Sequence, residues 1–249
     1  MPGVRCHISM KFIFILFIVF LSVYIAWEFL TRKYVNVYQL YLIFGHKGCG
    51  KSTLLQKLAI YYKKKGYHIY CNAGDSDLKE VCAIPIEYLP KLSLAAKDKE
   101  LQSQLADEFK EKGIVCPPFV KRKSVILVDE INLLWDNRDF KNFPKDMQRY
   151  FRLQRHYQHI FIGFSQTYDC DKKIRDLADY LLICRKKFRV WIRTTAYYKD
   201  TRVLSPSSEN SREAATMTDD FLRMGFFFDL FSPFQAWLPK WVKFHDSYK

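Results

Sequence analysis

The sequence predicts an α/β fold in which a mostly parallel β-sheet is flanked by helices. Short apolar runs rich in strand-forming residues alternate with helical stretches from Tyr38 onward. Strands separated by helices are typical of a parallel sheet that carries helices on both faces. The chain has 249 residues and 49% hydrophobic content, which is enough to bury one core. We therefore expect one main domain over residues 38–249.

The expected strands and helices follow one another along the chain. The strands are YQLYLIF at 38–44, YHIYCN at 67–72, SVILVDE at 124–130, HIFIGFS at 159–165 and LLIC at 181–184. The helices are 52–65, a charge-rich segment at 92–112 that ends at Gly113, then 146–157 and 171–180. The segment SPSSENSRE around Pro206 is expected to be a flexible loop.

An apolar segment near the amino end is expected to be a transmembrane helix, an anchor over residues 12–30. No charged residue occurs from Phe12 to Trp27, and this span is just long enough for a bilayer core of about 30 Å. The alternative is a cleaved signal peptide, but the residues before Ala26 lack the small-residue cleavage pattern. Residues 1–11 would form a short tail, and almost none of it would remain if translation starts at Met10.

Charge and cysteine usage narrow the setting in which the protein works. The formal net charge of +14 favours attraction to nucleic acid or to anionic lipid without choosing between them. The seven cysteines contain no CxxC pair, which argues against a disulfide framework and against a structural zinc site. A reducing compartment fits this usage best.

The stretch GHKGCGKST directly follows the first expected strand and opens the first expected helix. It matches the pattern GxxxxGK[ST] of a phosphate-binding loop (P-loop, Walker A) in full. Glycines allow backbone N–H groups to face a phosphate, and the helix start adds the positive end of its dipole. We expect Lys51 to contact the β- and γ-phosphates of ATP and the Ser52 hydroxyl to bind Mg²⁺. The predicted nucleotide-binding residues are Gly45, His46, Lys47, Gly48, Cys49, Gly50, Lys51, Ser52 and Thr53.

Two acids at the end of the strand VILV indicate hydrolysis of the bound nucleotide. Asp129 is expected to hold Mg²⁺, and Glu130 to polarise the attacking water, a task for which a carboxylate near a metal is suited. The alternative for Glu130 is an ordinary acid at a helix start, where acids are favoured by the helix dipole. The pair favours an ATPase over a protein that only binds nucleotide.

Two further polar residues are candidates for the same site. Gln166 follows the strand HIFIGFS and would point at the γ-phosphate if that strand lies beside the Asp129 strand, although it could simply be a polar residue that ends a strand. Arg175 lies on the next expected helix and could act as an arginine finger toward a neighbouring subunit. Its alternative is a solvated surface arginine.

The order of these segments resembles the zonula occludens toxin (Zot) family. The resemblance runs from the Walker A loop through VILVDEINLLWDNR and RLQRHYQHIFIGFSQ to KKIRDLADYLLICRK, and the closing FHDSYK also looks like the end of the family's ATPase domain. The most specific pieces are the acidic pair followed by Trp135 and Arg138, and Arg155-His156 leading into the strand that ends at Gln166. The family comprises assembly ATPases of filamentous phages and is related to the FtsK and HerA translocases.

This resemblance implies a membrane-anchored ATPase that couples ATP hydrolysis to DNA extrusion and coat assembly. The implied partners are copies of the same chain, possibly in a hexamer, together with phage single-stranded DNA, coat proteins and the inner or cytoplasmic membrane of the host. The ATPase domain would be cytoplasmic, where nucleotide is available, on a single-pass anchor. Here the anchor precedes the ATPase domain, whereas the best known relatives place theirs after it and continue on the far side of the membrane. The sequence shows no second membrane-length run that would lead to an extracytoplasmic segment, so the toxin activity in the family's name is not expected. The alternative function is a small-molecule P-loop enzyme such as a nucleotide kinase, which has little reason for an anchor.

Three less specific features leave alternatives open. In RVWIRTTAYY, one strand face would carry Arg189, Trp191 and Arg193, which suits either single-stranded DNA or an exposed edge strand kept soluble by arginine. A basic helix carries Arg149, Arg152 and Arg155, which suits solvent, DNA or a subunit contact. The aromatic tail FFFDLFSPFQAWLPKWVKF could lie at a membrane interface or pack as an ordinary terminal segment.

Overall fold

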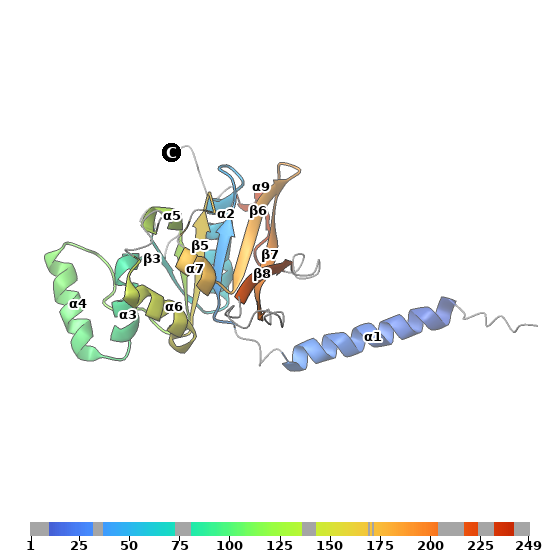
Figure 1. Ribbon diagram of the computed structural model, residues 1–249, viewed down its shortest axis with the longest axis horizontal. Helices are drawn as coiled ribbons and strands as arrows, with labels where there is room; N and C mark the ends of the chain where they lie inside the picture. The colour runs from blue at the N-terminus through green and yellow to red at the C-terminus, as the bar shows by residue number, and fades with distance from the viewer. Residues whose placement is uncertain are drawn as a thin grey trace, which may run out of the picture. The chain divides into compact units, whose positions relative to one another are not determined.

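A computed structural model of the chain (Figure 1) describes residues 10–31, 37–72, 81–135, 143–168, 170, 172–203, 217–223 and 232–241. The chain divides into two compact units, 1–37 and 38–249, and each is considered by itself. The second unit has the α/β architecture of parallel strands with flanking helices, so the predicted fold class is confirmed for it.

The first unit contains helix α1, Met10–Thr31, whose sequence is apolar on all sides. Its apolar side chains are exposed, from Phe14 to Trp27. Among the residues that the structure describes, no helix combines the length and the apolar character needed to cross a membrane. The anchor expected over residues 12–30 is therefore not confirmed.

The described residues of the second unit form one nine-stranded sheet. The parallel part contains β1 (Leu40–Phe44), β2 (His68–Cys71), β3 (Cys82–Ala83), β4 (Ser124–Val128), β5 (His159–Ser165) and β6 (Tyr180–Lys187). The antiparallel part adds β7 (Trp191–Val203), β8 (Met217–Arg223) and β9 (Ala236–Trp237). The strand order is β3-β2-β4-β5-β1-β6-β7-β8, with β9 paired to β7. Strand β1 thus lies between β5 and β6, and β5 lies between β1 and β4.

Helices cover both faces of the sheet. Successive residues of each strand point to opposite faces, and both sets are apolar, so each face must be covered. On one face, α2 (Lys51–Lys64) packs its leucines against Ile43 of β1 and Ile162 of β5, and α9 (Leu238–Trp241) packs beside it. The other face, which includes Leu42 and Phe161, is covered by α3 (Leu89–Ala95), α5 (Ile131–Leu134), α6 (Lys145–Tyr157) and α7 (Lys172–Leu177). Helix α4 (Lys99–Glu111) lies farther out, beyond α3 (Figure 1).

The single helix expected over residues 92–112 is wrong, because the segment forms two helices, α3 and α4. Asp98 starts the second helix: its carboxylate accepts hydrogen bonds from the backbone N–H groups of Glu100 and Leu101, at 3.0 and 3.3 Å. An aspartate at this position satisfies donors that a helix start leaves free. The chain can then turn, and α4 packs back on α3 through Leu105 and Phe109.

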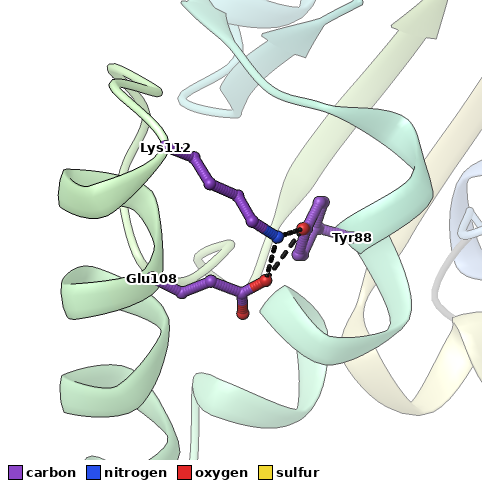
Figure 2. A network of polar contacts seen from close by, with 3 residues as sticks. All are labelled: Tyr88, Glu108 and Lys112. Carbon is purple, nitrogen blue, oxygen red and sulfur yellow. Dashed lines mark hydrogen bonds and ion pairs between the residues drawn. The ribbon is translucent and has the colours of Figure 1, made fainter.

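A small polar network also holds α4 against the turn before α3 (Figure 2). Lys112 Nζ lies 2.6 Å from Glu108 Oε1 and 2.7 Å from the hydroxyl of Tyr88, and that hydroxyl donates to Glu108 Oε1 at 2.9 Å. Tyr88 belongs to the short 3-10 helix η2, Ile86–Tyr88. The hydrogen bond from Lys112 is the main reason that the pKa of Glu108 is lowered.

The expectation for the segment RVWIRTTAYY also needs correction. Arg189 lies in the turn between β6 and β7, with a φ of 59°, and not on a strand face with Trp191 and Arg193. Strand β7 pairs with β6 along one side, and on the other side Trp191 and Ile192 pair with β9 and Tyr197–Val203 pair with β8. Arg193 lies between these two paired stretches, so the choice between a DNA contact and an exposed edge stays open for it.

Of the other features singled out in the sequence, some lie among the described residues and some do not. Trp135 is buried in the core, where its ring meets Phe143 and Phe151 edge to face, whereas Arg138 and the loop around Pro206 lie outside the described residues. Arg149, Arg152 and Arg155 are exposed along α6. In the described part of the aromatic tail, Phe234 and Leu238 are buried against α2, as expected for a packed segment.

Candidate nucleotide-binding site

The phosphate loop, Gly45 to Thr53, connects the end of β1 to the start of α2. Gly50 is the residue before the first helical turn and has a φ of 99°, and Gly48 has a φ of 79°. Only glycine adopts such angles without strain. A Cβ on Gly50 would also lie 2.4 Å from Ile192 Cδ1, so the loop is packed directly on β7. This local geometry is the one that the Walker A pattern predicts.

Lys51 is held inside this loop. Its side chain is buried, with 7% exposed, and Nζ donates to the carbonyl of Gly45 at 2.7 Å and to that of His46 at 3.2 Å. The ammonium group therefore lies within the ring formed by the loop backbone, beside the N-terminus of α2. Its positive charge would therefore lie next to a phosphate bound by the loop.

The remaining loop residues divide by exposure. His46, Lys47 and Gly48 are exposed at the tip, Ser52 is partly buried in the first turn of α2, and Cys49 and Thr53 are buried. The exposed tip leaves backbone groups accessible to a ligand, while the buried residues fix the loop on the sheet.

The acidic pair follows β4 at the same edge of the sheet. Glu130 adopts a left-handed conformation, with a φ of 49°, which turns the chain sharply into α5. Asn72, at the end of β2, brackets Asp129: its side chain accepts from Asp129 N at 2.8 Å and donates to Asp129 O at 2.9 Å. Asp129 Oδ1 in turn accepts from Glu130 N at 3.0 Å. The backbone that carries both acids is thus fixed by side-chain hydrogen bonds.

Gln166 reaches the acidic pair directly. Because β5 pairs with β4 in parallel register, the residues after each strand meet at one edge. The amide Nε2 of Gln166 donates to Glu130 Oε1 at 2.7 Å. The condition set by the sequence, that the two strands be neighbours, is confirmed, and Gln166 contacts the carboxylate predicted to activate water.

Arg175 on α7 is held over an aromatic ring of its own chain. Its guanidinium lies 4.5 Å from the centre of the Tyr168 ring, and that ring packs on Phe44 at the end of β1, 4.9 Å between centres. Nε of Arg175 is buried and has no hydrogen-bond partner within the described residues. The side chain is therefore fixed near the phosphate loop of its own chain, and its contact with another subunit stays a prediction.

A pocket of about 360 Å³ opens beside the phosphate loop on the α7 face of the sheet. Gly45, His46, Gln166 and Arg185 form its polar part, and Tyr168 with Tyr197 and the aliphatic residues of β6 forms its apolar wall. Gly45, the first residue of the loop, and Gln166, which contacts Glu130, thus line the same pocket. Its position gives a ligand held by the loop room to extend along β6.

Two residues of this site were not predicted from the sequence. Asn72 gave the same signal as Gln166, since it is a polar residue directly after a strand of the parallel sheet, so it could have been found. Tyr168 gave no such signal, because its role depends on the packing of α7 and β1, which no local pattern specifies.

The comparisons with known proteins agree with this geometry at the level of a family. Residues 36–170 match the family described as the AAA domain. No curated protein matches the chain. The assignment to a family rests on the AAA match, which covers the phosphate loop, the acidic pair and Gln166.

The chain is also similar to several solved structures. The N-terminal domain of zonular occludens toxin from Neisseria meningitidis is 12% identical, with a TM-score of 0.41, over 76% of this chain and 95% of that one. The genome packaging NTPase B204 from Sulfolobus turreted icosahedral virus 2, in complex with ATP-gammaS, is 15% identical with a TM-score of 0.40, over 60% of this chain and 75% of that one. The cytoplasmic domain of the Thermomonospora curvata Type VII secretion ATPase EccC is 20% identical with a TM-score of 0.39, over 60% of this chain and 21% of that one.

Proposed function

The chain belongs to the AAA domain family, and on that premise we propose that it is an ATPase that powers the assembly and export of a filamentous phage at a membrane. The observation that carries the catalytic part is the hydrogen bond between Gln166 and Glu130 at the edge of the sheet that bears the phosphate loop. A carboxylate oriented by an amide donor is suited to accept a proton from an attacking water.

Each residue of the site has a distinct task in this proposal. Lys51 and the loop N–H groups bind the phosphates, and Glu130 orients water, with its carboxylate held by Gln166. Ser52 and Asp129 offer hydroxyl and carboxylate oxygens, the ligands that Mg²⁺ prefers. When bound, Mg²⁺ would neutralise charge on the β- and γ-phosphates. We expect ATP hydrolysis by the purified chain to require Mg²⁺, and binding without any turnover would contradict the proposal.

The export role is supported by the order of motifs shared with the zonula occludens toxin family and by the net charge of +14. A strongly basic protein attracts the phosphate backbone of DNA. The test is an ATPase assay on the chain in vesicles, with and without single-stranded DNA and coat protein. We expect either partner to stimulate turnover several-fold. Turnover that responds to neither would leave an ATPase without the proposed role.

Attachment to a membrane is proposed for residues 12–30. The support is the charge-free run from Phe12 to Trp27 and the exposure of its apolar side chains on α1. With the ATPase domain in the cytoplasm, protease added to right-side-out cells should spare residues 38–249. Degradation of that domain would overturn the orientation, and extraction of the full chain by alkaline carbonate would overturn the anchor.

A ring, with a hexamer as the specific expectation, is proposed as the working form, with Arg175 completing the site of a neighbouring subunit. A finger supplied by a neighbour contributes about 10³ to 10⁵ in rate in other P-loop systems. Mixing inactive Arg175→Ala and Lys51→Ala chains should then restore activity, because some interfaces combine an intact loop with an intact arginine. A mixture that co-assembles and stays inactive would rule out Arg175 as the finger, and Arg185 or an arginine of the helix with Arg149, Arg152 and Arg155 would become the next candidate.

A further inference from the structure

Two cysteines meet at the base of the phosphate loop. The Sγ atoms of Cys49, inside the loop, and Cys184, on β6, are 3.6 Å apart although the residues are 135 positions apart in sequence. Both side chains are buried, with 7% and 1% exposed. The two cysteines meet because β6 pairs with β1. Phe44, the last residue of β1, pairs with Ile183, so Cys184 lies beside the start of the phosphate loop. None of the six cysteines that the structure describes forms a disulfide.

The surroundings of this pair favour reaction at Cys49. The hydrogen bond with Cys184 is the main cause that lowers the pKa of Cys49; burial opposes this, and the nearby charge of Lys51 supports it. The same hydrogen bond, with burial, raises the pKa of Cys184. The thiolate is the nucleophilic form of cysteine, so Cys49 is the attacking group and Cys184 the resolving one.

We propose that Cys49 and Cys184 form a reversible disulfide on reaction with hydrogen peroxide, and that this disulfide weakens nucleotide binding by the phosphate loop. The inference rests on the nucleotide binding that the proposed function assigns to this loop. It makes the loop a site of oxidative modification as well as a ligand site.

The reaction balances with peroxide as the only co-reactant. The Cys49 thiolate attacks one peroxide oxygen, the O–O bond breaks, and hydroxide leaves as the S–O bond of a sulfenic acid forms. The Cys184 thiol attacks the sulfur of that sulfenic acid, the S–S bond forms, and the S–O bond breaks. The hydroxide from this second step takes up the proton of the Cys184 thiol, and the hydroxide from the first step takes up the proton that Cys49 released when it became a thiolate. Two thiols lose two electrons to peroxide, and the products are one disulfide and two water molecules.

Both thiols are buried, so an oxidant must reach them through the loop. Cys49 directly follows His46, Lys47 and Gly48, which are exposed at the loop tip. Hydrogen peroxide is only slightly larger than water, which needs about 30 Å³, so a small opening of the tip would admit it before larger electrophiles.

The bond would distort the loop and not the sheet. A disulfide requires sulfur atoms about 2.05 Å apart, so the pair must approach by about 1.5 Å from its present 3.6 Å. Cys184 is fixed on β6, which pairs with β1 and with β7. Cys49 lies between Gly48 and Gly50, two left-handed glycines that allow the backbone to shift.

Gly45 transmits that shift to the phosphate site. A Cβ at Gly45 would lie 2.7 Å from Cys49 Sγ and 2.9 Å from the Cys184 carbonyl, so no free space separates these residues. The Gly45 carbonyl also accepts the hydrogen bond from Lys51. Movement of Cys49 toward β6 therefore displaces both the loop N–H groups and the carbonyl that positions Lys51.

The test uses the full chain, treated with hydrogen peroxide and compared with the reduced chain. We expect a peptide that joins Cys49 to Cys184, with a mass two hydrogens below the sum of its parts. We also expect at least a ten-fold loss of affinity for a fluorescent ATP analogue and full recovery after dithiothreitol. Cys184→Ala and Cys184→Ser should each lose this response, with every variant compared with its own reduced form. The matched control, Cys82→Ser, removes an exposed thiol and should respond like the natural chain.

The outcomes separate this inference from the proposed function. Reduced chain that binds no nucleotide would overturn the proposed function and this inference with it. Reduced chain that binds nucleotide, but gives no Cys49–Cys184 peptide after peroxide, would overturn this inference alone. So would a peptide that forms while the affinity stays unchanged, or an equal loss of affinity in the Cys184 variants.

Discussion

Strand β1 has a neighbour on each side, and the two neighbours bring different side chains to the phosphate loop. On the β5 side, the neutral amide of Gln166 donates to Glu130, whose carboxylate can carry charge and accept a proton. On the β6 side, Cys184 contacts Cys49, and these two buried thiols can be oxidised to a disulfide. The two pairs belong to the same parallel part of the sheet. In the proposals above, the first pair affects turnover and the second affects the shape of the loop. We call Gln166 and Glu130 the catalytic flank of the loop, and Cys49 and Cys184 the thiol flank. A substitution in one flank is expected to leave the effect of the other unchanged.

The largest effect on nucleotide binding is expected at Lys51, which lies in the phosphate loop between the two flanks. Lys51→Ala removes the buried ammonium that would contact the phosphates and that now bonds to Gly45 and His46. Each lost bond to a charged group costs about 1.5 to 3 kcal/mol, so nucleotide affinity should fall about a hundred-fold or more. Calorimetric titration with ATP measures this. Lys64→Ala, an exposed position on the same helix, is the control and should bind normally. Retained affinity in Lys51→Ala would remove the loop from the site.

Glu130→Gln should break the catalytic flank and spare binding. Loss of a general base slows a reaction by about 10² to 10⁴, while the loop and Lys51 are unchanged. Turnover and ATP affinity are measured on the same preparation, and the peroxide response of Cys49 should persist. Glu111→Gln on α4 is the matched control and should turn over ATP at the normal rate. Unchanged turnover in Glu130→Gln would show that Glu130 is only a residue at a helix start.

Asn72→Ala should weaken the catalytic flank without abolishing it. The variant loses the two bonds that hold the backbone of Asp129, at 2.8 and 2.9 Å. A hydrogen bond contributes about 1 kcal/mol net, so about ten-fold more Mg²⁺ should be needed for half-maximal turnover. A titration of turnover against Mg²⁺ concentration gives this shift. An unchanged Mg²⁺ requirement, with the unfolding temperature lowered, would assign Asn72 a role in stability alone.

The smallest effect on nucleotide chemistry is expected at the opposite end of β5. His159 is buried, with Nδ1 3.1 Å from the Tyr150 hydroxyl and Nε2 3.2 Å from the Lys121 carbonyl. Burial lowers its pKa to about 4 from an ordinary 6.5, so the folded chain binds fewer protons than the unfolded chain between these values. The free energy of unfolding should therefore fall by up to about 3 kcal/mol as the pH drops from 6.5 to 4.

Urea unfolding across that pH range measures the effect of His159. His159→Gln should lose this part of the pH dependence, and His68→Gln, which removes an exposed histidine, should keep it. ATP affinity at neutral pH should be unchanged in His159→Gln. Equal pH dependence in the natural chain and in His159→Gln would contradict a neutral, buried imidazole.

The sequence predicts the parallel core better than its surroundings, for physical reasons. Strands such as β4 and β5 are continuous apolar runs, and the phosphate loop needs glycines at fixed positions, so local patterns suffice for both. The break between α3 and α4 was missed because Ala95 and Ala96 favour helix, while the decisive contact is the Asp98 cap. The interior position of β7 depends on pairing with β8, a non-local contact that alternation of residues cannot reveal.

The candidate site divides in the same way. Gln166 and Glu130 could be placed together because parallel strands end at one edge of a sheet. The contact between Cys49 and Cys184 could not, because it requires the order of β1 and β6 and the tight approach at Gly45. Arg175 was predicted as a finger toward a neighbouring subunit or as a solvated arginine, and its contact with Tyr168 could not be predicted because it depends on how α7 packs.

The most direct test of the catalytic flank is a double-mutant cycle between Glu130 and Gln166, read as single-turnover ATP hydrolysis. Gln166→Ala alone should slow hydrolysis about 10- to 100-fold, because Glu130 loses the donor at 2.7 Å that orients it. If Gln166 acts through Glu130, the double variant should be no slower than Glu130→Gln, to within about two-fold. Losses that multiply, so that the double variant is slower by the full factor of Gln166→Ala, would contradict the account.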